Sequence, residues 1–222
     1  MGNFLASIIS PFEEILKFMI TILHGGFSNY GVIIILLTII IKMLLLPLTL
    51  KQDKSMRAMK KIQPEMDSVR EKYKDNPQEM NKAVMELYQK HNVNPFGGCL
   101  PVLLQLPILW ALFNVIKNPV IIPKDAHFLI FSLQAKDSLY ILPVLNALIA
   151  FLQQKIMNIG GKSNPQMEMM TYIFPVMMFA ISFSMPAGLQ IYWITSSAIS
   201  VLQQYLINKW ATIKEEKIGK SI

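Results

Sequence analysis

One lysine stands inside the most apolar segment of this chain. The run from Ile33 to Leu50 reads IIILLTIIIKMLLLPLTL, and Lys42 is its only charged residue. A lysine near the middle of a membrane-crossing helix raises the free energy of insertion by about 2.5 to 3.5 kcal/mol, so a partner, water or a function must offset that penalty. The chemistry that a buried ammonium group offers is attraction of a carboxylate or transfer of a proton.

The apolar segments hold no carboxylate that suits this lysine as a resident partner. The five segments contain no aspartate or glutamate except Glu168 at the edge of one, and Asp137 lies just outside another. We therefore expect Lys42 to face polar side chains or water, or to be uncharged, and to have a functional role.

Polar side chains recur at spacings of three and four residues along the apolar segments. Such spacings place side chains on one face of a helix. Small and amide side chains also hold membrane helices together, which is a sufficient explanation for any one of them alone. Together with an unpaired lysine, they predict a hydrophilic groove. The candidate groove residues are Thr38, Lys42, Thr49, Gln105, Asn146, Gln153, Gln154, Gln190, Trp193, Ser197 and Ser200.

The cysteine and histidine content argues against metal chemistry. The chain has one cysteine, Cys99, and three histidines that are far apart in the sequence. An internal disulfide framework or a four-cysteine metal site is therefore excluded, and no spacing suggests a cluster of metal ligands. We expect no metal, no cofactor and no catalytic residue, so the chain is not predicted to be an enzyme.

The composition is that of a membrane protein with several spans. Of 222 residues, 53% are hydrophobic and only 16% are charged. Because a helix needs roughly 20 apolar residues to cross a bilayer, this length accommodates about five spans and one polar excursion. The predicted fold class is an all-α membrane protein, with five transmembrane helices, an outer interfacial amphipathic helix and a cytoplasmic helical hairpin.

The expected segments follow from the charge and apolar pattern. Glu13, Glu14 and Lys17 interrupt the first apolar stretch, so that stretch is predicted to lie in the interface rather than to span. Asn76 followed by Pro77 is a helix start between two amphipathic stretches, which predicts an antiparallel hairpin. The segments are an extracytoplasmic interfacial helix at 1–28, spans at 29–50, 96–116, 139–157, 167–185 and 188–208, the hairpin at 51–95, an external loop at 117–138, a cytoplasmic loop at 158–166 and a basic cytoplasmic tail at 209–222.

Lysine and arginine are shared unevenly between the two sets of connections. One set holds sixteen of these residues and the other holds four. The richer set is 51–94, 155–162 and the tail from 209, and the poorer set is 1–28, 117–137 and the turn near Pro186. By the positive-inside rule, the hairpin and the C-terminus are predicted to be cytoplasmic, and the N-terminus is predicted to lie outside.

Four stretches of the sequence resemble a known family. They read NYGVIIILLTIIIKMLLLPLTLKQDKSMRAMKKIQPEM, NPFGGCLPVLLQLPILWALF, FLQQKIM and PAGLQIYWITSSAISVLQQ, and they lie between Asn29 and Gln204. In content and order they resemble the YidC-type membrane protein insertases, the YidC/Oxa/Alb family that includes the mitochondrial and chloroplast inner-membrane insertases. The second stretch is long and unusual, which makes the resemblance specific.

The resemblance implies a groove that opens to the cytoplasm and to lipid and is closed on the outside. It further implies that Lys42 attracts acidic residues of an incoming protein, and that Trp193, Gln153 and Gln154 belong to the groove. Many bacterial members have arginine in place of this lysine, and an ammonium group lacks the planar fork of donors that arginine offers. We expect a short form without the large periplasmic domain that some members carry.

The resemblance also implies partners and a location. The implied partners are nascent membrane proteins, the ribosome and membrane lipids, and the chain is expected to act as a monomer in the bacterial cytoplasmic membrane. The basic C-terminal tail is short, which weakens the case for ribosome docking through it. Cooperation with the Sec translocon or the signal recognition particle pathway stays open.

Two alternatives from other functional classes stay open. A small-molecule or ion transporter would use Lys42 as a binding or proton-relay group, although the sequence lacks the inverted repeats that are typical of transporters. A membrane scaffold that only docks or folds other proteins would keep the hairpin and would tolerate loss of the lysine.

Overall fold

The computed structural model describes residues 2–94, 100–158 and 165–219. Parts of five expected segments, those at 1–28, 51–95, 96–116, 158–166 and 209–222, lie outside the described residues, and Cys99 is among the residues left out. The described part forms helices and one small β-hairpin. The elements are α1 (Gly2–His24), α2 (Tyr30–Leu44), α3 (Leu46–Lys61), α4 (Gln63–Lys72), α5 (Pro77–Lys90), α6 (Leu100–Lys117), β1 (His127–Phe128), β2 (Phe131–Ser132), α7 (Ile141–Asn158), α8 (Pro165–Ser182) and α9 (Ala187–Gly219).

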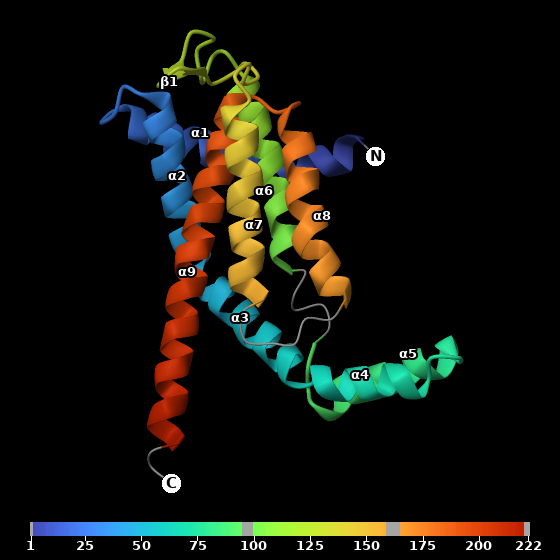
Figure 1. The fold of residues 1–222 in the computed structure, drawn as a ribbon. Helices are drawn as coiled ribbons and strands as arrows, with labels where there is room; N and C mark the ends of the chain where they lie inside the picture. Colours follow the sequence, from blue (N-terminus) through green and yellow to red (C-terminus); the bar gives the residue numbers. More distant parts are fainter. Residues whose placement is uncertain (1, 95–99, 159–164, 220–222) are drawn as a thin grey trace.

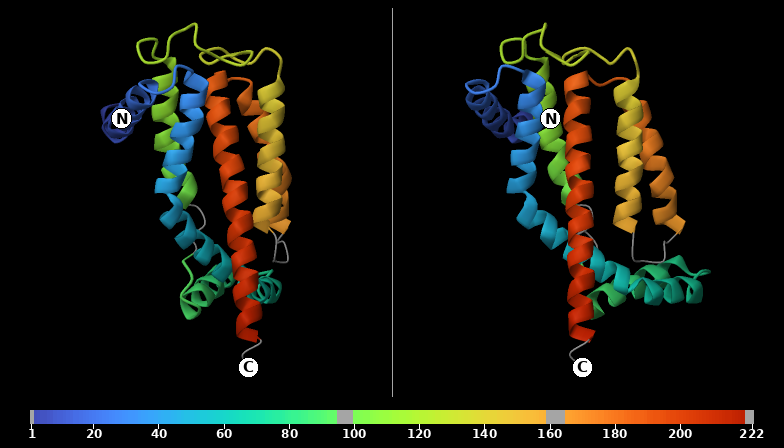
Figure 2. Two further views of the ribbon diagram at one scale, coloured as in Figure 1. Left: turned by 90° about the vertical axis from the view of Figure 1, so that its left-hand side faces the viewer. Right: turned by 60° about the vertical axis from the view of Figure 1, so that its left-hand side comes forward.

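Five helices form an upright bundle. Helix α8 packs on α7, α7 packs on α9, and α9 packs on both α2 and α6. Helix α1 lies across one end of this bundle, against α6 and α2 (Figure 1, Figure 2). Helices α4 and α5 project from the opposite end, and α9 extends beyond the other helices of the bundle on that side. The bundle therefore has two different ends, one carrying the β-hairpin and one carrying α4 and α5.

No single helix in the described residues has both the length and the hydropathy needed to cross a bilayer. Helices α2 and α3 meet these criteria only together, as a pair bent by 58°. Pro47 in the first turn of α3 accounts for the bend, because proline lacks the N–H that would continue α2 and its ring collides with the carbonyl four residues earlier. The expected span at 29–50 thus consists of two helices, and the count of five spans stays a prediction.

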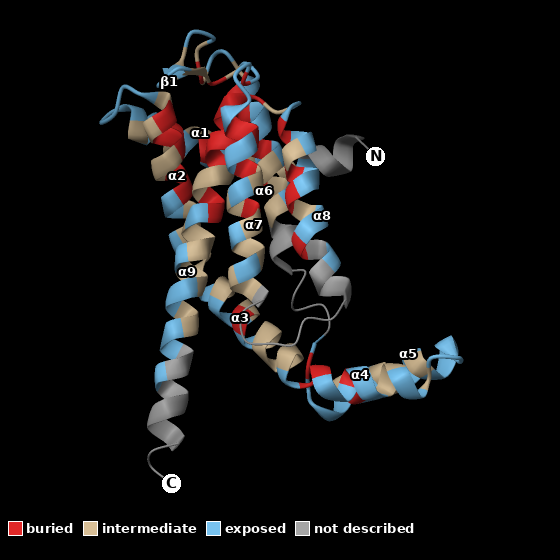
Figure 3. Ribbon diagram, in the orientation of Figure 1, coloured by how far each residue is buried: buried red, intermediate tan, exposed pale blue. Residues whose placement is uncertain are grey.

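The end that carries the β-hairpin has a dense apolar core. Helices α1, α2, α6 and α9 contribute side chains that are fully or almost fully buried. The loop between α6 and α7 covers this core, since Leu133 O accepts a hydrogen bond of 2.9 Å from Gly188 N, and Ala135 O accepts one of 2.7 Å from Ala187 N. Figure 3 shows the buried residues concentrated at this end. The fully buried apolar side chains include Ile33, Ile34, Leu37, Leu112, Ile116, Ile122 and Leu133.

Gly31 shows how closely the loop packs on the bundle. It lies in the first turn of α2, against the ring of Phe128 in β1. A Cβ atom at Gly31 would lie only 2.3 Å from carbon atoms of Phe128. Any larger residue at this position would therefore push the β-hairpin away from α2.

Helix α1 has apolar side chains on two faces. Leu16 and Ile20 are buried against the bundle, whereas Ile15, Phe18 and Ile22 are exposed. A helix in a membrane interface is expected to expose apolar side chains to lipid in this way. The interfacial position of α1 stays a prediction, and the exposed apolar face supports it.

Helices α4 and α5 pack against each other at the far end of α3. Near the start of α4, Glu65 Oε2 lies 3.1 Å from His91 Nε2 and 3.7 Å from Lys90 Nζ, at the end of α5. Asn76 caps α5, because its side chain accepts a hydrogen bond from the backbone N–H of Glu79, as the sequence predicted. Helix α5 therefore runs back along α4.

Candidate functional site

Lys42 lies in the last turn of α2 rather than in the middle of a long helix. Its Nζ donates a hydrogen bond of 2.8 Å to Ser200 Oγ on α9, and Ser200 Oγ donates one of 3.0 Å to Ser196 O. Among the described residues, no carboxylate forms an ion pair with Lys42. The carbonyl groups at the C-terminus of α2 favour a cation there, so the bend after Leu44 reduces the penalty of this charge.

Asp137, the acid nearest to α7, has a structural role. Its carboxylate is buried and accepts hydrogen bonds from the backbone N–H groups of Leu139, at 2.9 Å, and Leu142, at 2.7 Å. Leu142 lies in the first turn of α7 and Leu139 just before it, so the carboxylate lies where the helix dipole favours a negative charge. Asp137 therefore caps α7 at the end of the bundle opposite to α4 and α5.

Two of the predicted groove residues form a buried amide pair. Asn146 on α7 and Gln190 on α9 are almost fully enclosed, and Asn146 Nδ2 lies 3.4 Å from Gln190 Oε1. Gln190 Nε2 also donates to Met185 O at 3.1 Å. Within the described part, the buried Asn146 Oδ1 and Ser182 Oγ have no hydrogen-bond partner. Each such atom lowers the free energy of unfolding by about 1 to 3 kcal/mol. The polar groups in this region therefore destabilise the fold.

The two predicted threonines bond to their own helices. Thr38 is buried and its hydroxyl donates to Ile34 O at 2.6 Å, and the Thr49 hydroxyl donates to Leu45 O at 3.1 Å. Gln105 on α6 donates instead to the hydroxyl of Tyr192 on α9, at 2.7 Å. Sequence reasoning had not named Tyr192.

The remaining predicted residues lie on α7 and α9, which pack together. Ser197 is buried, whereas Trp193, Gln153 and Gln154 are half-buried. No hydrogen bond within the described residues joins these four side chains to Lys42. The structure thus brings together Lys42 with Ser200 and Asn146 with Gln190, and the shared groove role of all eleven residues stays a prediction.

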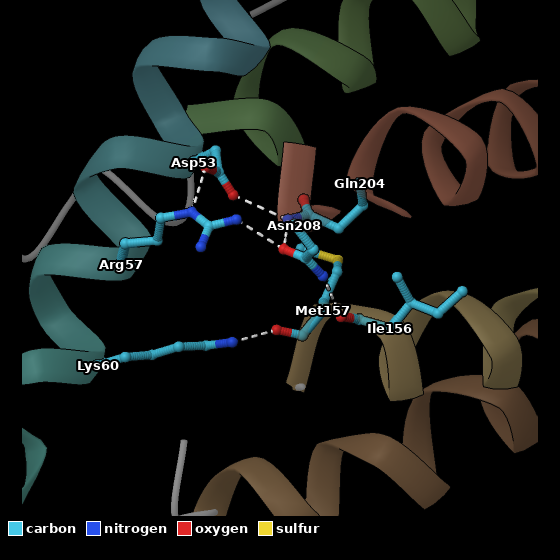
Figure 4. Close-up of polar contacts among 7 residues, drawn as sticks. All are labelled: Asp53, Arg57, Lys60, Ile156, Met157, Gln204 and Asn208. Carbon is cyan, nitrogen blue, oxygen red and sulfur yellow. Dashed lines mark hydrogen bonds and ion pairs between the residues drawn. The ribbon is translucent and has the colours of Figure 1, made fainter. Parts of the chain in front are cut away.

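A polar cluster that sequence reasoning had not named joins α3 to α9. It consists of Asp53, Arg57, Gln204 and Asn208, and we call it the α3–α9 polar cluster (Figure 4). Arg57 Nε donates to Asp53 Oδ2 at 2.6 Å, and an Arg57 terminal nitrogen donates to Asn208 Oδ1 at 2.7 Å. Gln204 Nε2 donates to Asp53 Oδ1 at 2.8 Å and to Asn208 Oδ1 at 3.0 Å. Both oxygens of the Asp53 carboxylate therefore have a donor.

Backbone carbonyl groups in the last turn of α7 accept hydrogen bonds from side chains of α3 and α9. Asn208 Nδ2 donates to Ile156 O at 3.4 Å, and Lys60 Nζ donates to Met157 O (Figure 4). Burial lowers the pKa of Lys60 below its usual value, the neighbouring Arg57 lowers it further, and Asp53 acts in the opposite direction. Three helices, α3, α7 and α9, are thus connected by polar contacts at this end.

The contacts along α9 repeat every four residues. Ser200 contacts Lys42, Gln204 contacts Asp53, and Asn208 contacts Arg57. Residues four apart lie on one face of a helix, so one face of α9 meets first α2 and then α3. Two signals in the sequence pointed to this face: the spacing of Asp53 and Arg57, which suits an ion pair on one helix, and the extension of the α9 polar series to Asn208.

Relatives of known name match almost the whole chain. Residues 22–216 match the 60Kd inner membrane protein family. The membrane protein insertase YidC of Fusobacterium nucleatum subsp. nucleatum is 52% identical over 202 residues, which are 91% of this chain and 97% of that relative. The membrane protein insertase MisCA of Bacillus subtilis is 40% identical over 205 residues, which are 90% of this chain and 77% of that relative.

The fold is also similar to a solved structure. That structure is described as an active YidC insertase with the first transmembrane domain resolved, and it matches with a TM-score of 0.72 at 28% sequence identity. The match covers 88% of this chain and 46% of that chain, so this chain spans less than half of the length of that protein. The helical fold, the family match and the relatives agree: the chain belongs to the 60Kd inner membrane protein family, the family of the YidC-type membrane protein insertases.

Proposed function

We propose that this chain inserts newly made membrane proteins into the bacterial cytoplasmic membrane and helps them to fold. The relatives support this class of function through their names. The observation that carries the mechanism is the position of Lys42, whose ammonium group lies between apolar helices and is held by the neutral Ser200 hydroxyl. Such a cation is suited to take a carboxylate from outside the protein as its partner.

The attraction between Lys42 and an incoming carboxylate is large enough to matter. At about 4 Å and an effective dielectric constant of about 20, two unit charges attract by about 4 kcal/mol before desolvation is subtracted. A hydroxyl is a weaker partner for an ammonium group than a carboxylate is, so a carboxylate can replace Ser200. The apolar segment of the incoming protein then moves into lipid, which supplies the driving force for insertion.

The proposal includes a membrane arrangement and a hydrophilic groove. We place α4, α5 and the C-terminal part of α9 in the cytoplasm and α1 at the outer surface, with five spans between them. The groove would open to the cytoplasm and to lipid, and the dense core beneath the β-hairpin supports closure on the outer side. Nascent membrane proteins are the substrates, and the ribosome, the Sec translocon and the signal recognition particle pathway are candidate partners.

A reconstituted insertion assay tests the proposal. Liposomes that contain only this chain receive a single-span substrate with an acidic translocated tail, and protection of that tail from protease measures insertion. Lys42→Arg should keep insertion, whereas Lys42→Ala and Lys42→Glu should lower its initial rate about tenfold or more, because the charge attraction is lost or reversed. Lys124→Ala, which removes an exposed lysine from the loop, is the matched control.

Two outcomes would contradict the proposal. Equal insertion by the wild type and all three Lys42 variants would remove the role of the charge. Ion flux across the liposome membrane that needs Lys42 and proceeds without any protein substrate would favour a transporter instead.

A further inference from the structure

We propose that Asp53 is a specificity-determining residue, which occupies Arg57 in the resting protein and sets how many acidic residues an incoming segment must carry. The inference rests on the proposed insertase function. In it, the carboxylate of Asp53 stands in for a carboxylate of the substrate, and the substrate must replace it to reach Lys42.

The first support is the geometry of the Asp53 carboxylate. It is buried, with 8% of the residue exposed, yet it lies on a helix that leads to the projecting α4 and α5. Its two oxygens are bound by Arg57 on the same helix and by Gln204 on α9. A buried carboxylate that is fully bonded holds its position firmly, but each of its bonds is one that another carboxylate can form with the same donors.

The second support is the charge around Asp53. Arg57 balances the charge of Asp53 within the cluster, and Lys60, which lies on the same helix and donates to Met157 O, adds a second positive charge beside it. The Arg57 side chain is 34% exposed, whereas that of Asp53 is 10% exposed. An acidic segment that approaches the α3–α9 polar cluster from solvent therefore meets the more exposed Arg57 side chain before it meets the Asp53 carboxylate.

The third support is the position of the cluster relative to Lys42. Ser200, which holds Lys42, and Asn208, which holds Arg57, lie on the same face of α9 with Gln204 between them. A segment that displaces Asp53 from Arg57 is thus aligned with the face of α9 that leads to Lys42. The same displacement breaks the contact from Asp53 to Gln204, and this contact holds α3 against α9.

The consequence is a threshold for acidic substrates. A tail with one carboxylate must compete with Asp53 for Arg57 before it reaches Lys42. A tail with several carboxylates can replace Asp53 at Arg57 and still bind Lys42. A tail without carboxylates does not replace Asp53, so the hydrogen bonds of the α3–α9 polar cluster stay intact.

The first test compares substrates that differ only in the acidity of the translocated tail, with none, one or several carboxylates. With the wild-type chain in liposomes, insertion should rise steeply between one carboxylate and several. In Asp53→Asn the competitor is gone, so the initial rate for the one-carboxylate tail should rise about fivefold, as expected for loss of a partly exposed ion pair. Asp75→Asn makes the same charge change at an exposed position of the connection between α4 and α5 and should leave the rates unchanged.

The second test follows the α3–α9 contact through the position of α4, which continues directly from α3. Spin labels at the exposed positions Ser68 and Tyr205, in a Cys99→Ser background, report the distance between α4 and α9 by pulsed electron paramagnetic resonance. A peptide with an acidic tail should shift this distance, whereas a peptide with the matching amides should not. Asp53→Asn, whose neutral amide oxygen is a weaker acceptor for Arg57 and Gln204 than the carboxylate, should show part of the shifted population without any peptide. An unchanged distance with the acidic peptide at concentrations that support insertion would overturn the proposal.

The two tests separate this inference from the proposed function. Asp53→Asn keeps an oxygen for Gln204, and its thermal unfolding shows whether the variant is folded. If the wild type inserts no substrate, the proposed function fails, and the distance measurement still tests the cluster. If the wild type inserts and needs Lys42, but Asp53→Asn behaves as Asp75→Asn does in both tests, the cluster has no role in selection and the proposed function stands.

Discussion

The two ends of the helix bundle are held together by different kinds of contact. Beneath the β-hairpin, apolar side chains from α1, α2, α6 and α9 are fully or almost fully buried. At the end that carries α4 and α5, the helices meet through the α3–α9 polar cluster and through Lys60 and its bond to Met157 O. Figure 3 shows this difference as a change from buried to partly exposed residues along the bundle.

The two kinds of contact are expected to differ in how easily they separate. Packed apolar side chains lose their contacts outright when they separate, and nothing in the incoming chain restores them in the same positions. Polar contacts can be exchanged one for one with water or with a polar group of a substrate. Under the proposed function, the polar end is therefore the end expected to receive the substrate, and the apolar end is expected to stay closed.

The largest effect should come from a cavity at the apolar end. Leu112 on α6 is fully buried, so Leu112→Ala should lower the free energy of unfolding by about 2 to 5 kcal/mol. Leu106, on the same helix, is 56% exposed, and Leu106→Ala should change it by less than about 1 kcal/mol. Denaturant unfolding of the protein in lipid nanodiscs measures both. Similar losses in the two variants would show that the core beneath the β-hairpin is not the stable end.

A smaller loss is expected at the polar end. Arg57→Ala leaves the buried Asp53 carboxylate with Gln204 alone, which should lower the free energy of unfolding by about 1 to 3 kcal/mol. Arg57→Lys should recover part of this, since one ammonium group does not reproduce the bonds to both Asp53 and Asn208. A double-mutant cycle with Asp53→Asn isolates the pair, and purely additive losses would contradict the coupling.

The smallest effect concerns the contact between α4 and α5. The hydrogen bond from His91 lowers the pKa of Glu65, burial opposes this, and the charges of His91 and Lys90 lower it again. Because the folded pKa lies below the unfolded one, the contact contributes stability above the usual glutamate range, and this is lost as the pH falls through the lowered value. The protection factors of the amides in the last turn of α5, which are exchange rates corrected for the intrinsic rate at each pH, should therefore fall at acidic pH.

Glu65→Gln separates this contact from general acid effects. The variant should show the lower protection factors already at neutral pH, and these should lose most of their pH dependence. Glu71→Gln, at an exposed position of α4, is the matched control and should behave as the wild type. An acid response that persists in Glu65→Gln would show that another group controls this turn.

Local patterns predicted several elements correctly. Asn76 caps α5 because an amide oxygen before a proline and a glutamate suits a helix start in any context. The bend at Leu45 was not predicted, although Pro47 was visible, because a proline in an apolar run either kinks a span or begins a new helix. The packing of neighbouring helices decides between these two outcomes. Because α2 ends at this bend, Lys42 lies at a helix end and not in the middle of a helix, where it was expected.

The candidate site was predictable only in part. Lys42 and the polar series on α9 stood out in the sequence, because a cation and amides are rare in apolar segments. The pairing of Lys42 with Ser200, and of Arg57 with Asn208, could not be predicted from the sequence, because these partners are separated by 158 and 151 residues. Helical spacing says which residues share a face, but it leaves open which turn of another helix that face meets.

The amino-acid pattern was enough to predict the class of the protein, most of its helices and a lysine with no acid in the same apolar segment. Hydropathy and charge spacing are local properties, so they can be read without a partner helix. The three-dimensional fold was needed to see that Asp53 is a buried acid held by Arg57 and Gln204, because the burial of a polar side chain depends on the helices that enclose it. It also decided that one end of the bundle closes with apolar side chains and the other with exchangeable polar contacts.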